Sequence, residues 1–419
     1  MDNPRVRLAV MIILFAIILI LVAVTSAWSD VDHYWVNTND ILVDGRMPYS
    51  DSVFEYPPLT LLFFMVPRLV SPSLEVYHYV FAVFADSFVL VILYFGYRIG
   101  DMYSVDRRYV FVMIAAMTLG AHYLISCRYD VIPAAFTVMG LYLYLSRRYS
   151  LAFLIMAVAT MIKLYPALIL LAMLIPFLLR KDWRMLFMGV FVSLAVCLLS
   201  ELPFLIDNYQ TAFAYLGYHS DRGIQVESLA ASFLFLYNVL MPGSVTIGFS
   251  YGSHNLEGPA ADALVPFMNY ILIALILAIT VFTVLRLHRS GNKDNYFGIV
   301  CITAELLLMA FVIFGKVYSA QYMIWIIAII PAIYCSITVS EERRALYCWT
   351  LCFAVVSGLA LTYYRYVGFE EHYAGFVIVE IVKNIVHLLL MGFLFRLLMK
   401  LTSNVKKDSG LIEECESDT

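Results

Sequence analysis

The sequence predicts an all-α polytopic membrane protein. Of the 419 residues, 63% are hydrophobic and only 14% are charged, and the mean hydropathy is +0.84. Long apolar runs recur along the whole chain, and basic residues gather at alternate junctions between them. Such a composition excludes a soluble globular domain. The net charge of −4 says little by itself, because the location of charge matters more than its sum in a membrane protein. We expect no nucleic-acid partner.

Twelve apolar runs predict about 12 transmembrane helices in a single domain over residues 1–401. They cover 8–27, 75–97, 109–126, 131–146, 149–162, 164–179, 185–204, 262–285, 296–314, 319–338, 345–364 and 374–398. The first run could also belong to a signal peptide, but it exceeds the roughly 7 to 15 apolar residues of such a segment. At about 1.5 Å per residue it reaches about 30 Å, the thickness of a bilayer core. We therefore expect an uncleaved helix here, and a polar, disordered tail over 402–419.

The basic residues predict the orientation of these helices. With the N-terminus in the cytoplasm, 19 of the 27 Lys and Arg residues fall on the inner side, as the positive-inside rule requires. We therefore expect a multi-pass plasma-membrane protein with both termini cytoplasmic. This arrangement requires residues 54–71 to enter the outer leaflet and return, because the apolar part between Pro58 and Arg68 is too short to span comfortably. If 54–71 did cross, the orientation of everything downstream would reverse.

The first outer loop, residues 28–74, holds the most informative polar stretch of the chain. Residues 30–58 read DVDHYWVNTNDILVDGRMPYSDSVFEYPP and carry six carboxylates against the single Arg46. A carboxylate held where membrane meets water can take a proton from a polar acceptor, so this loop predicts an enzyme with its site on the outer face. Asp30 and Asp32 follow the first span directly. The structural alternative for either one is a solvated loop acid or a helix cap.

Other charges outside the cytoplasmic side fall at further outer turns: Arg128-Tyr129-Asp130, Lys163-Leu164-Tyr165-Pro166, the long outer loop 205–261 that contains Arg222, and Lys316 to Tyr322. The predicted spans 131–146 and 149–162 are short, about 24 and 21 Å, and short helices leave a polar cavity open to one face. An unpaired ammonium at membrane depth is costly, so Lys163 needs an anionic partner. That partner is either a structural pair with Asp130 or a substrate phosphate.

The remaining ionisable residues give a weaker signal. Asp86, Glu201, Glu305, Lys383 and His387 lie within or near predicted spans, where polar pairs between helices are as plausible as substrate contacts. The seven cysteines show no paired metal spacing. The acidic residues of the first loop match no EF-hand pattern, and we expect neither metal nor cofactor.

Five segments together resemble glycosyltransferase family 87, a family of membrane enzymes in the GT-C superfamily similar to polyprenyl-phosphate-mannose-dependent mannosyltransferases. They are YWVNTNDILVDGRMPYSDSVFEYPP, RYDVIPAAF, MIKLYPAL, YHSDRGIQVES and GKVYSAQYMIW, in this order from about Asp30 to Trp325. The resemblance implies a GT-C-type helical bundle with an outer-face catalytic loop. The chain has Ser319-Ala320-Gln321 where the family often has Ser-Pro-Gln, which puts the local backbone shape there in question.

The resemblance also implies roles for particular residues. An Asp in the first outer loop is the catalytic base of the family, and the D-x-x-x-Y pattern places it at Asp30 with Tyr34 as the tyrosine, while Asp32 is the rival. The implied substrate-binding residues are Tyr34, Tyr56, Arg128, Asp130, Lys163, Tyr165, His219, Arg222, Gln225, Glu227, Lys316 and Gln321. Asp40, Asp44, Asp51 and Glu55 are left to loop structure, solubility or acceptor contacts.

The expected reaction transfers a sugar, mannose being the first choice, from a polyprenyl-phosphate donor to a lipid-linked or glycan acceptor with inversion. The leaving phosphate already carries charge and needs no general acid, in contrast to glycoside hydrolysis. One base and a set of phosphate-binding cations are therefore enough. The alternatives are a transporter or flippase of lipid-linked sugar, and a non-catalytic assembly protein. Membrane lipid is a partner in each case.

Overall fold

The computed structural model describes residues 13, 15, 29–220, 222–290, 296–367 and 373–403. The first predicted span, 8–27, lies almost wholly outside the described residues, and so does most of the predicted tail over 402–419.

The predicted all-α membrane architecture is confirmed. Among the described residues, six helices are long and apolar enough to cross a bilayer. They are α4 (Leu74–Met102), α10 (Trp183–Asn208), α13 (Pro259–Ser290), α14 (Tyr296–Phe314), α16 (Ser340–Thr362) and α17 (Tyr373–Leu401). Shorter apolar helices are α3 (Thr60–Val70), α7 (Val131–Leu145), α8 (Tyr149–Ile162), α9 (Pro166–Leu179), α12 (Leu229–Leu240) and α15 (Tyr322–Ser336). The structure does not confirm the predicted count of about 12 spans.

Local sequence accounts for several helix starts. Asp106 accepts a hydrogen bond from the Arg108 backbone and caps α5 (Arg107–Ala121). Asp182 caps α10 and Ser228 caps α12 in the same way, as short polar side chains do at helix N-termini.

Helix α5 is shorter than the predicted span 109–126. It ends at Ala121, and His122 then takes a positive φ of 50° before the short helix α6 (Leu124–Cys127) begins. The apolar run therefore contains a break between two helices that hydropathy cannot detect.

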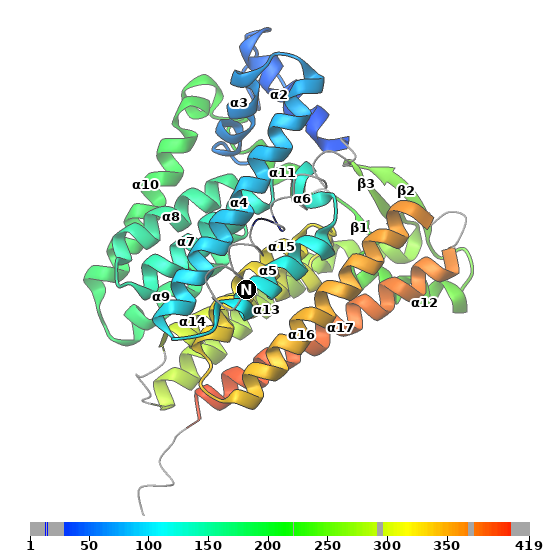
Figure 1. Cartoon of the computed structure of the whole chain (residues 1–419). Helices are drawn as coiled ribbons and strands as arrows, with labels where there is room; N and C mark the ends of the chain where they lie inside the picture. The colour runs from blue at the N-terminus through cyan, green and yellow to red at the C-terminus, as the bar shows by residue number, and fades with distance from the viewer. Residues whose placement is uncertain are drawn as a thin grey trace, which may run out of the picture.

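Two polar regions predicted as loops are partly structured. Residues Ser29–Leu42 form helix α2, and α3 follows it. With 11 residues, α3 is about 16 Å long and too short to cross a bilayer, in line with the prediction for 54–71. The two helices lie at one end of the bundle (Figure 1).

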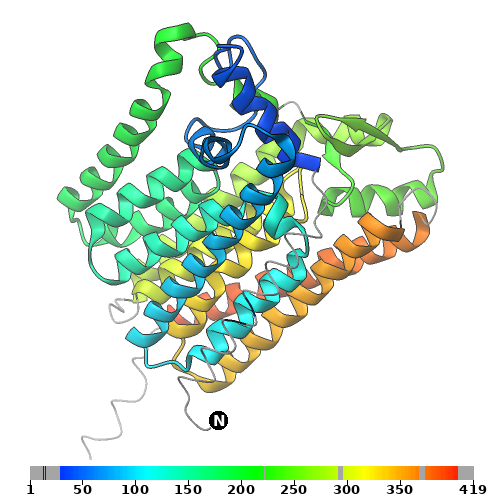
Figure 2. The same ribbon diagram turned by 45° about the horizontal axis from the view of Figure 1, so that its top comes forward.

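The long segment 205–261 contains helix α11 (Ala214–Ser220) and a small antiparallel sheet that an all-α prediction misses. Strand β3 (Ser253–Glu257) lies between β1 (Ile224–Gln225) and β2 (Thr246–Ser250). This sheet sits beside α2 and α3 at the same end of the molecule (Figure 2).

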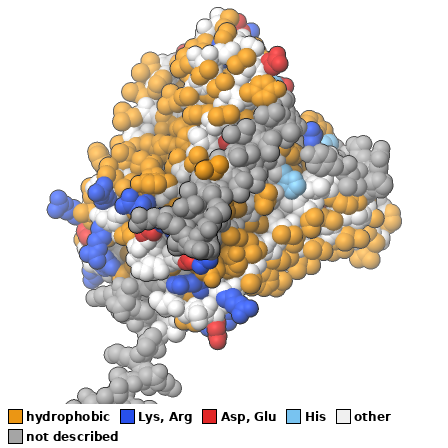
Figure 3. Space-filling model, in the orientation of Figure 1, with side chains coloured by type: hydrophobic (Ala, Val, Ile, Leu, Met, Phe, Trp, Pro, Cys, Tyr) orange, Lys and Arg blue, Asp and Glu red, His pale blue; other side chains and the backbone are white. Residues whose placement is uncertain are grey.

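Helices α14 and α15 form the centre of the bundle, with nearly all of their side chains buried. Helix α9 packs on one side of α14 and α17 on another. The face of the molecule seen in Figure 3 is largely hydrophobic, and Lys and Arg side chains on it gather toward the end opposite α2 and α3.

Candidate active site

A cavity of about 670 Å³ opens where the polar segments converge, and its size is typical of sites for small molecules. Its walls include α2, residues 53–57 before α3, the α6–α7 and α8–α9 junctions, residues 222–227 and residues 315–325. Twelve of the fourteen predicted site residues line it: Asp30, Tyr34, Tyr56, Arg128, Asp130, Lys163, Tyr165, Arg222, Gln225, Glu227, Lys316 and Gln321. The side chain of His219 lies outside the described residues.

The two candidate bases, Asp30 and Asp32, point to different sides of helix α2. Asp30 faces the cavity and forms an ion pair with Arg128. Asp32 is absent from the lining, has a side chain 52% exposed, and lies 2.5 Å from Nε2 of His78. Because a helix turns about 100° per residue, positions two apart point in nearly opposite directions. Of the two, only Asp30 is therefore placed to meet a substrate in this cavity.

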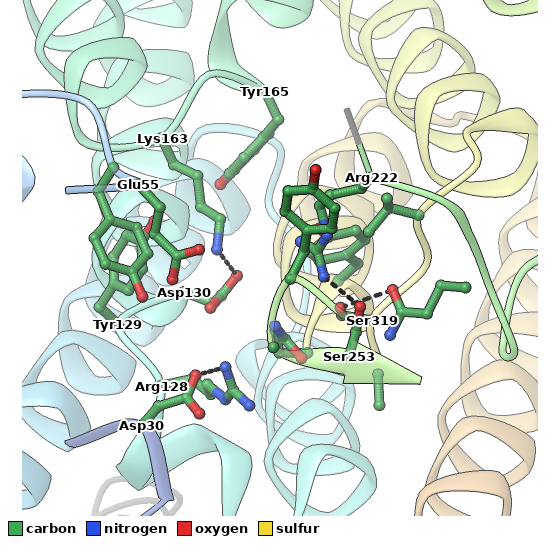
Figure 4. Close-up of a pocket in the computed structure, with 18 of the residues that line it drawn as sticks. Asp30, Glu55, Arg128, Tyr129, Asp130, Lys163, Tyr165, Arg222, Ser253 and Ser319 are labelled. Atoms are coloured by element: carbon green, nitrogen blue, oxygen red, sulfur yellow. Dashed lines mark hydrogen bonds and ion pairs between the residues drawn. The ribbon is translucent and has the colours of Figure 1, made fainter. Parts of the chain in front are cut away.

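Arg128 directly follows α6, and its side chain lines the cavity. Burial lowers the pKa of its guanidinium, while the nearby charge of Asp130 opposes that shift. Its Nε has no hydrogen-bond partner among the described residues. Figure 4 shows Arg128 beside Asp30, with Lys163 and Asp130 as a second pair in the same cavity.

Lys163 lies at the end of α8, with its Nζ 2.6 Å from Oδ1 of Asp130. The same oxygen accepts a hydrogen bond of 2.9 Å from the indole nitrogen of Trp325. The ring of Tyr129 is 4.4 Å from the ammonium, a cation–π distance. Burial lowers the pKa of Lys163, and Asp130 counters this shift. The ion pair between Lys163 and Asp130, one of the two alternatives expected from the sequence, is therefore present.

The opposite wall is built from the small sheet and the segment after α14. Arg222 donates a 2.9 Å hydrogen bond from Nη2 to Ser253, and its Nε has no partner in the described part of the chain. The Gln225 backbone NH donates to the Lys316 carbonyl at 2.9 Å. The Gln225 side chain donates to Glu227 at 3.2 Å. Burial raises the pKa of Glu227.

Aromatic rings fill much of the remaining wall. Tyr165 stacks on Trp325 at 4.3 Å, and Tyr322 stacks on the same indole at 4.0 Å. Tyr34 stacks on Phe64 at 4.1 Å. Such rings combine a flat apolar face with a polar edge, which suits the contact surface of a sugar.

Sequence reasoning missed several cavity residues. They are Glu55, Tyr129, Ser253, Ser319, Tyr322 and Trp325. All but Ser253 lie inside the five segments that resemble the family, so their position in these segments could have indicated a role in the site. For Glu55 the sequence predicts only loop structure, solubility or acceptor contacts. Among the residues that the structure describes, four cations (Arg128, Lys163, Arg222, Lys316) and four carboxylates (Asp30, Glu55, Asp130, Glu227) line the cavity.

Comparison with known families identifies the class of protein. The sequence profile of glycosyltransferase family 87 matches residues 54–312. The match covers more than half of the chain, so the chain belongs to glycosyltransferase family 87 and is a membrane glycosyltransferase. Asp30 and Lys316 lie outside the matched range. A comparison with curated proteins gives no match.

Among solved structures, the chain is similar to a crystal structure of ArnT from Cupriavidus metallidurans bound to undecaprenyl phosphate. The sequence identity is 16%, the TM-score is 0.48, and the alignment covers 96% of this chain and 78% of the other.

Proposed function

We propose that this protein transfers a sugar, expected to be mannose, from a polyprenyl-phosphate donor to a lipid-linked or glycan acceptor, with Asp30 as general base. Family membership supports a glycosyltransferase. The observation that carries the proposal is the placement of Asp30 beside Arg128 in a cavity lined by three further cations.

In the proposed reaction, an acceptor hydroxyl oxygen attacks the anomeric carbon of the donor sugar. Its proton goes to the Asp30 carboxylate, and the bond from carbon to the phosphate oxygen breaks. The polyprenyl phosphate leaves with the electron pair, and attack from the opposite side inverts the anomeric carbon. A positioned base contributes about 10² to 10⁴ in rate.

The cations would hold the donor phosphate. Arg128 and Lys163 each have a carboxylate partner in the cavity, whereas Arg222 is held by the neutral Ser253. An incoming phosphate can compete with Asp30 for Arg128, which would release the carboxylate for proton transfer. Arg222 keeps its charge directed to the ligand, so it is the stronger candidate for first contact with phosphate.

The orientation supports an active site on the outer face. The cavity lies at the α2–α3 end, while Lys and Arg side chains gather at the opposite end (Figure 3), which by the positive-inside rule would be cytoplasmic. A lipid donor could then keep its chain in the bilayer and present its phosphate to the cavity.

Purified protein in vesicles should transfer label from a polyprenyl-phosphate sugar to an acceptor-lipid extract. Parallel reactions with mannose, glucose and arabinose donors identify the sugar, and we expect mannose to give the highest kcat/KM. Movement of labelled lipid across the bilayer without a glycosidic product would instead identify a transporter. Absence of both binding and turnover with every donor would favour a non-catalytic assembly protein.

A further inference from the structure

A polar cluster on α17 lies behind the cavity rather than in it. Glu380, Lys383 and Asn384 are each at most 1% exposed, and no residue of α17 in the described structure lines the cavity. Lys383 pairs with Glu380 one turn away on the same helix. Charged groups inside a spanning helix are costly, which makes their partners informative.

The first partner is the backbone of a cavity wall. Lys383 Nζ donates a 2.8 Å hydrogen bond to the carbonyl of Glu227. Asn384 donates to the carbonyl of Ser228 at 3.3 Å and to the hydroxyl of Ser232 at 2.8 Å. These three acceptors lie where strand β1 turns into helix α12. The α17 side chains therefore fix the peptide that carries Gln225 and Glu227.

The second partner is the segment that follows α14. The ring of Tyr318 lies 3.9 Å from Lys383 Nζ and is fully buried. Tyr318 lies two residues after Lys316 and three before Gln321, and the Lys316 carbonyl accepts the backbone NH of Gln225. One ammonium thus contacts both cavity-lining segments at the place where they join.

We propose that Glu380, Lys383 and Asn384 form a clamp that positions residues 225–228 and 316–321 for substrate binding. They are positioning residues, because they act on the cavity through backbone carbonyls and one aromatic ring. The clamp lies beyond the residues matched to the family profile, which end at 312.

The test uses the full chain and measures amide hydrogen exchange of residues 225–232. The backbone NH of Gln225 donates to the Lys316 carbonyl and that of Ser228 donates to the Gln225 carbonyl, so the exchange of these two groups reports opening of the joint. The paired variant Glu380→Gln with Lys383→Met removes the ion pair of the clamp without leaving the Glu380 carboxylate buried and unpaired. Asn384→Leu removes the hydrogen bonds to Ser228 and Ser232 without changing charge. This variant provides the test if the paired variant does not fold.

Lys400→Met is the matched control. Lys400 is on the same helix, its side chain is 54% exposed, and its partner Glu342 keeps Arg396 when Lys400 is lost. We expect exchange of 225–232 to accelerate about tenfold or more in the paired variant, which loses a hydrogen bond made by a charged group, and about threefold or more in Asn384→Leu, which loses neutral hydrogen bonds. The control should show no acceleration. Exchange in α7 and α8 should stay unchanged. Equal exchange in clamp and control variants would overturn the proposal, as would acceleration spread evenly over α7 and α8.

A kinetic measurement adds a readout that rests on the proposed function. In the clamp variants, KM for the polyprenyl-phosphate sugar should rise about tenfold with a smaller change in kcat. Combining them with Gln225→Ala should raise KM little further, because the clamp acts through that segment. Fully additive effects would contradict positioning. If the wild type transfers no sugar, the proposed function fails, while hydrogen exchange still tests the clamp.

Discussion

Lys163 and Asp130 meet in the cavity wall, where Asp130 is 1% exposed and its Oδ1 also accepts the Trp325 indole NH. Removing one member of a buried pair leaves the other charge uncompensated, at a cost of about 3 to 5 kcal/mol. We therefore expect Lys163→Met to lower the Tm of the purified protein strongly. The double variant Lys163→Met with Asp130→Asn should recover most of that loss.

Activity then separates the two roles considered for Lys163. If the ammonium contacts the donor phosphate, the double variant should be stable yet transfer sugar at least about tenfold more slowly, because a hydrogen bond to a charged group is lost. A stable double variant with normal turnover would leave Lys163 with a structural role alone.

Glu227 gives a pH prediction. Burial raises its pKa from an ordinary 4.5 to about 8, so the folded state binds this proton more tightly than the unfolded state does. The resulting stabilisation is complete below pH 4.5 and is lost as the pH rises through about 8. Wild-type Tm should therefore fall relative to that of Glu227→Gln between pH 5 and 8. The exposed Glu257 provides the control Glu257→Gln, and an unchanged Tm gap across this range would refute the prediction.

At the scale of elements, hydropathy predicted most of the long helices because an uninterrupted apolar run has few alternatives to a helix in lipid. Hydropathy does not predict α2, because polar and charged residues are interspersed with the apolar ones. Its buried positions Val31, Tyr34 and Thr38 follow helical spacing, so the periodicity was readable. The small sheet was not readable, because strands of two and five residues are too short to show alternation.

Helix α3 allows a direct test of the local topology. If α3 does not cross the bilayer, cysteines placed at Asp44 and Ser73, on either side of it, must face the same compartment. In a background with the seven native cysteines replaced, an impermeant maleimide added to sealed vesicles should label both variants or neither. Labelling of only one would show that α3 crosses.

At the scale of the whole molecule, the sequence predicts that the charged outer turns converge on one face, but not which of their side chains pair with one another. Asp30, Lys163 and Lys316 come from segments far apart in the chain, and only packing of the bundle brings them to one cavity. The family resemblance narrowed the base to Asp30 or Asp32. Of these two residues, the structure places only Asp30 at the cavity, because helix α2 points their side chains in different directions. The sequence predicts a loop here, so it could not distinguish the two orientations.

The distribution of basic residues predicts the orientation of the whole protein. Arg147 and Arg344 are exposed and belong to the predicted cytoplasmic set. Cysteines at these two positions should therefore be labelled only from the side opposite to Asp44→Cys and Ser73→Cys. Labelling of all four from one side would contradict the predicted topology.

The proposed role of Asp30 as the base can be tested with paired Asn substitutions at Asp30 and Asp32. Single-turnover transfer from a radiolabelled polyprenyl-phosphate sugar should be measured for Asp30→Asn and Asp32→Asn at matched protein level and Tm. We expect Asp30→Asn to slow transfer by about 10² to 10⁴. Asp32→Asn, which loses only a half-exposed pair with His78, should stay within about twofold of wild type. Normal transfer by a folded Asp30→Asn protein would show that Asp30 is not the base.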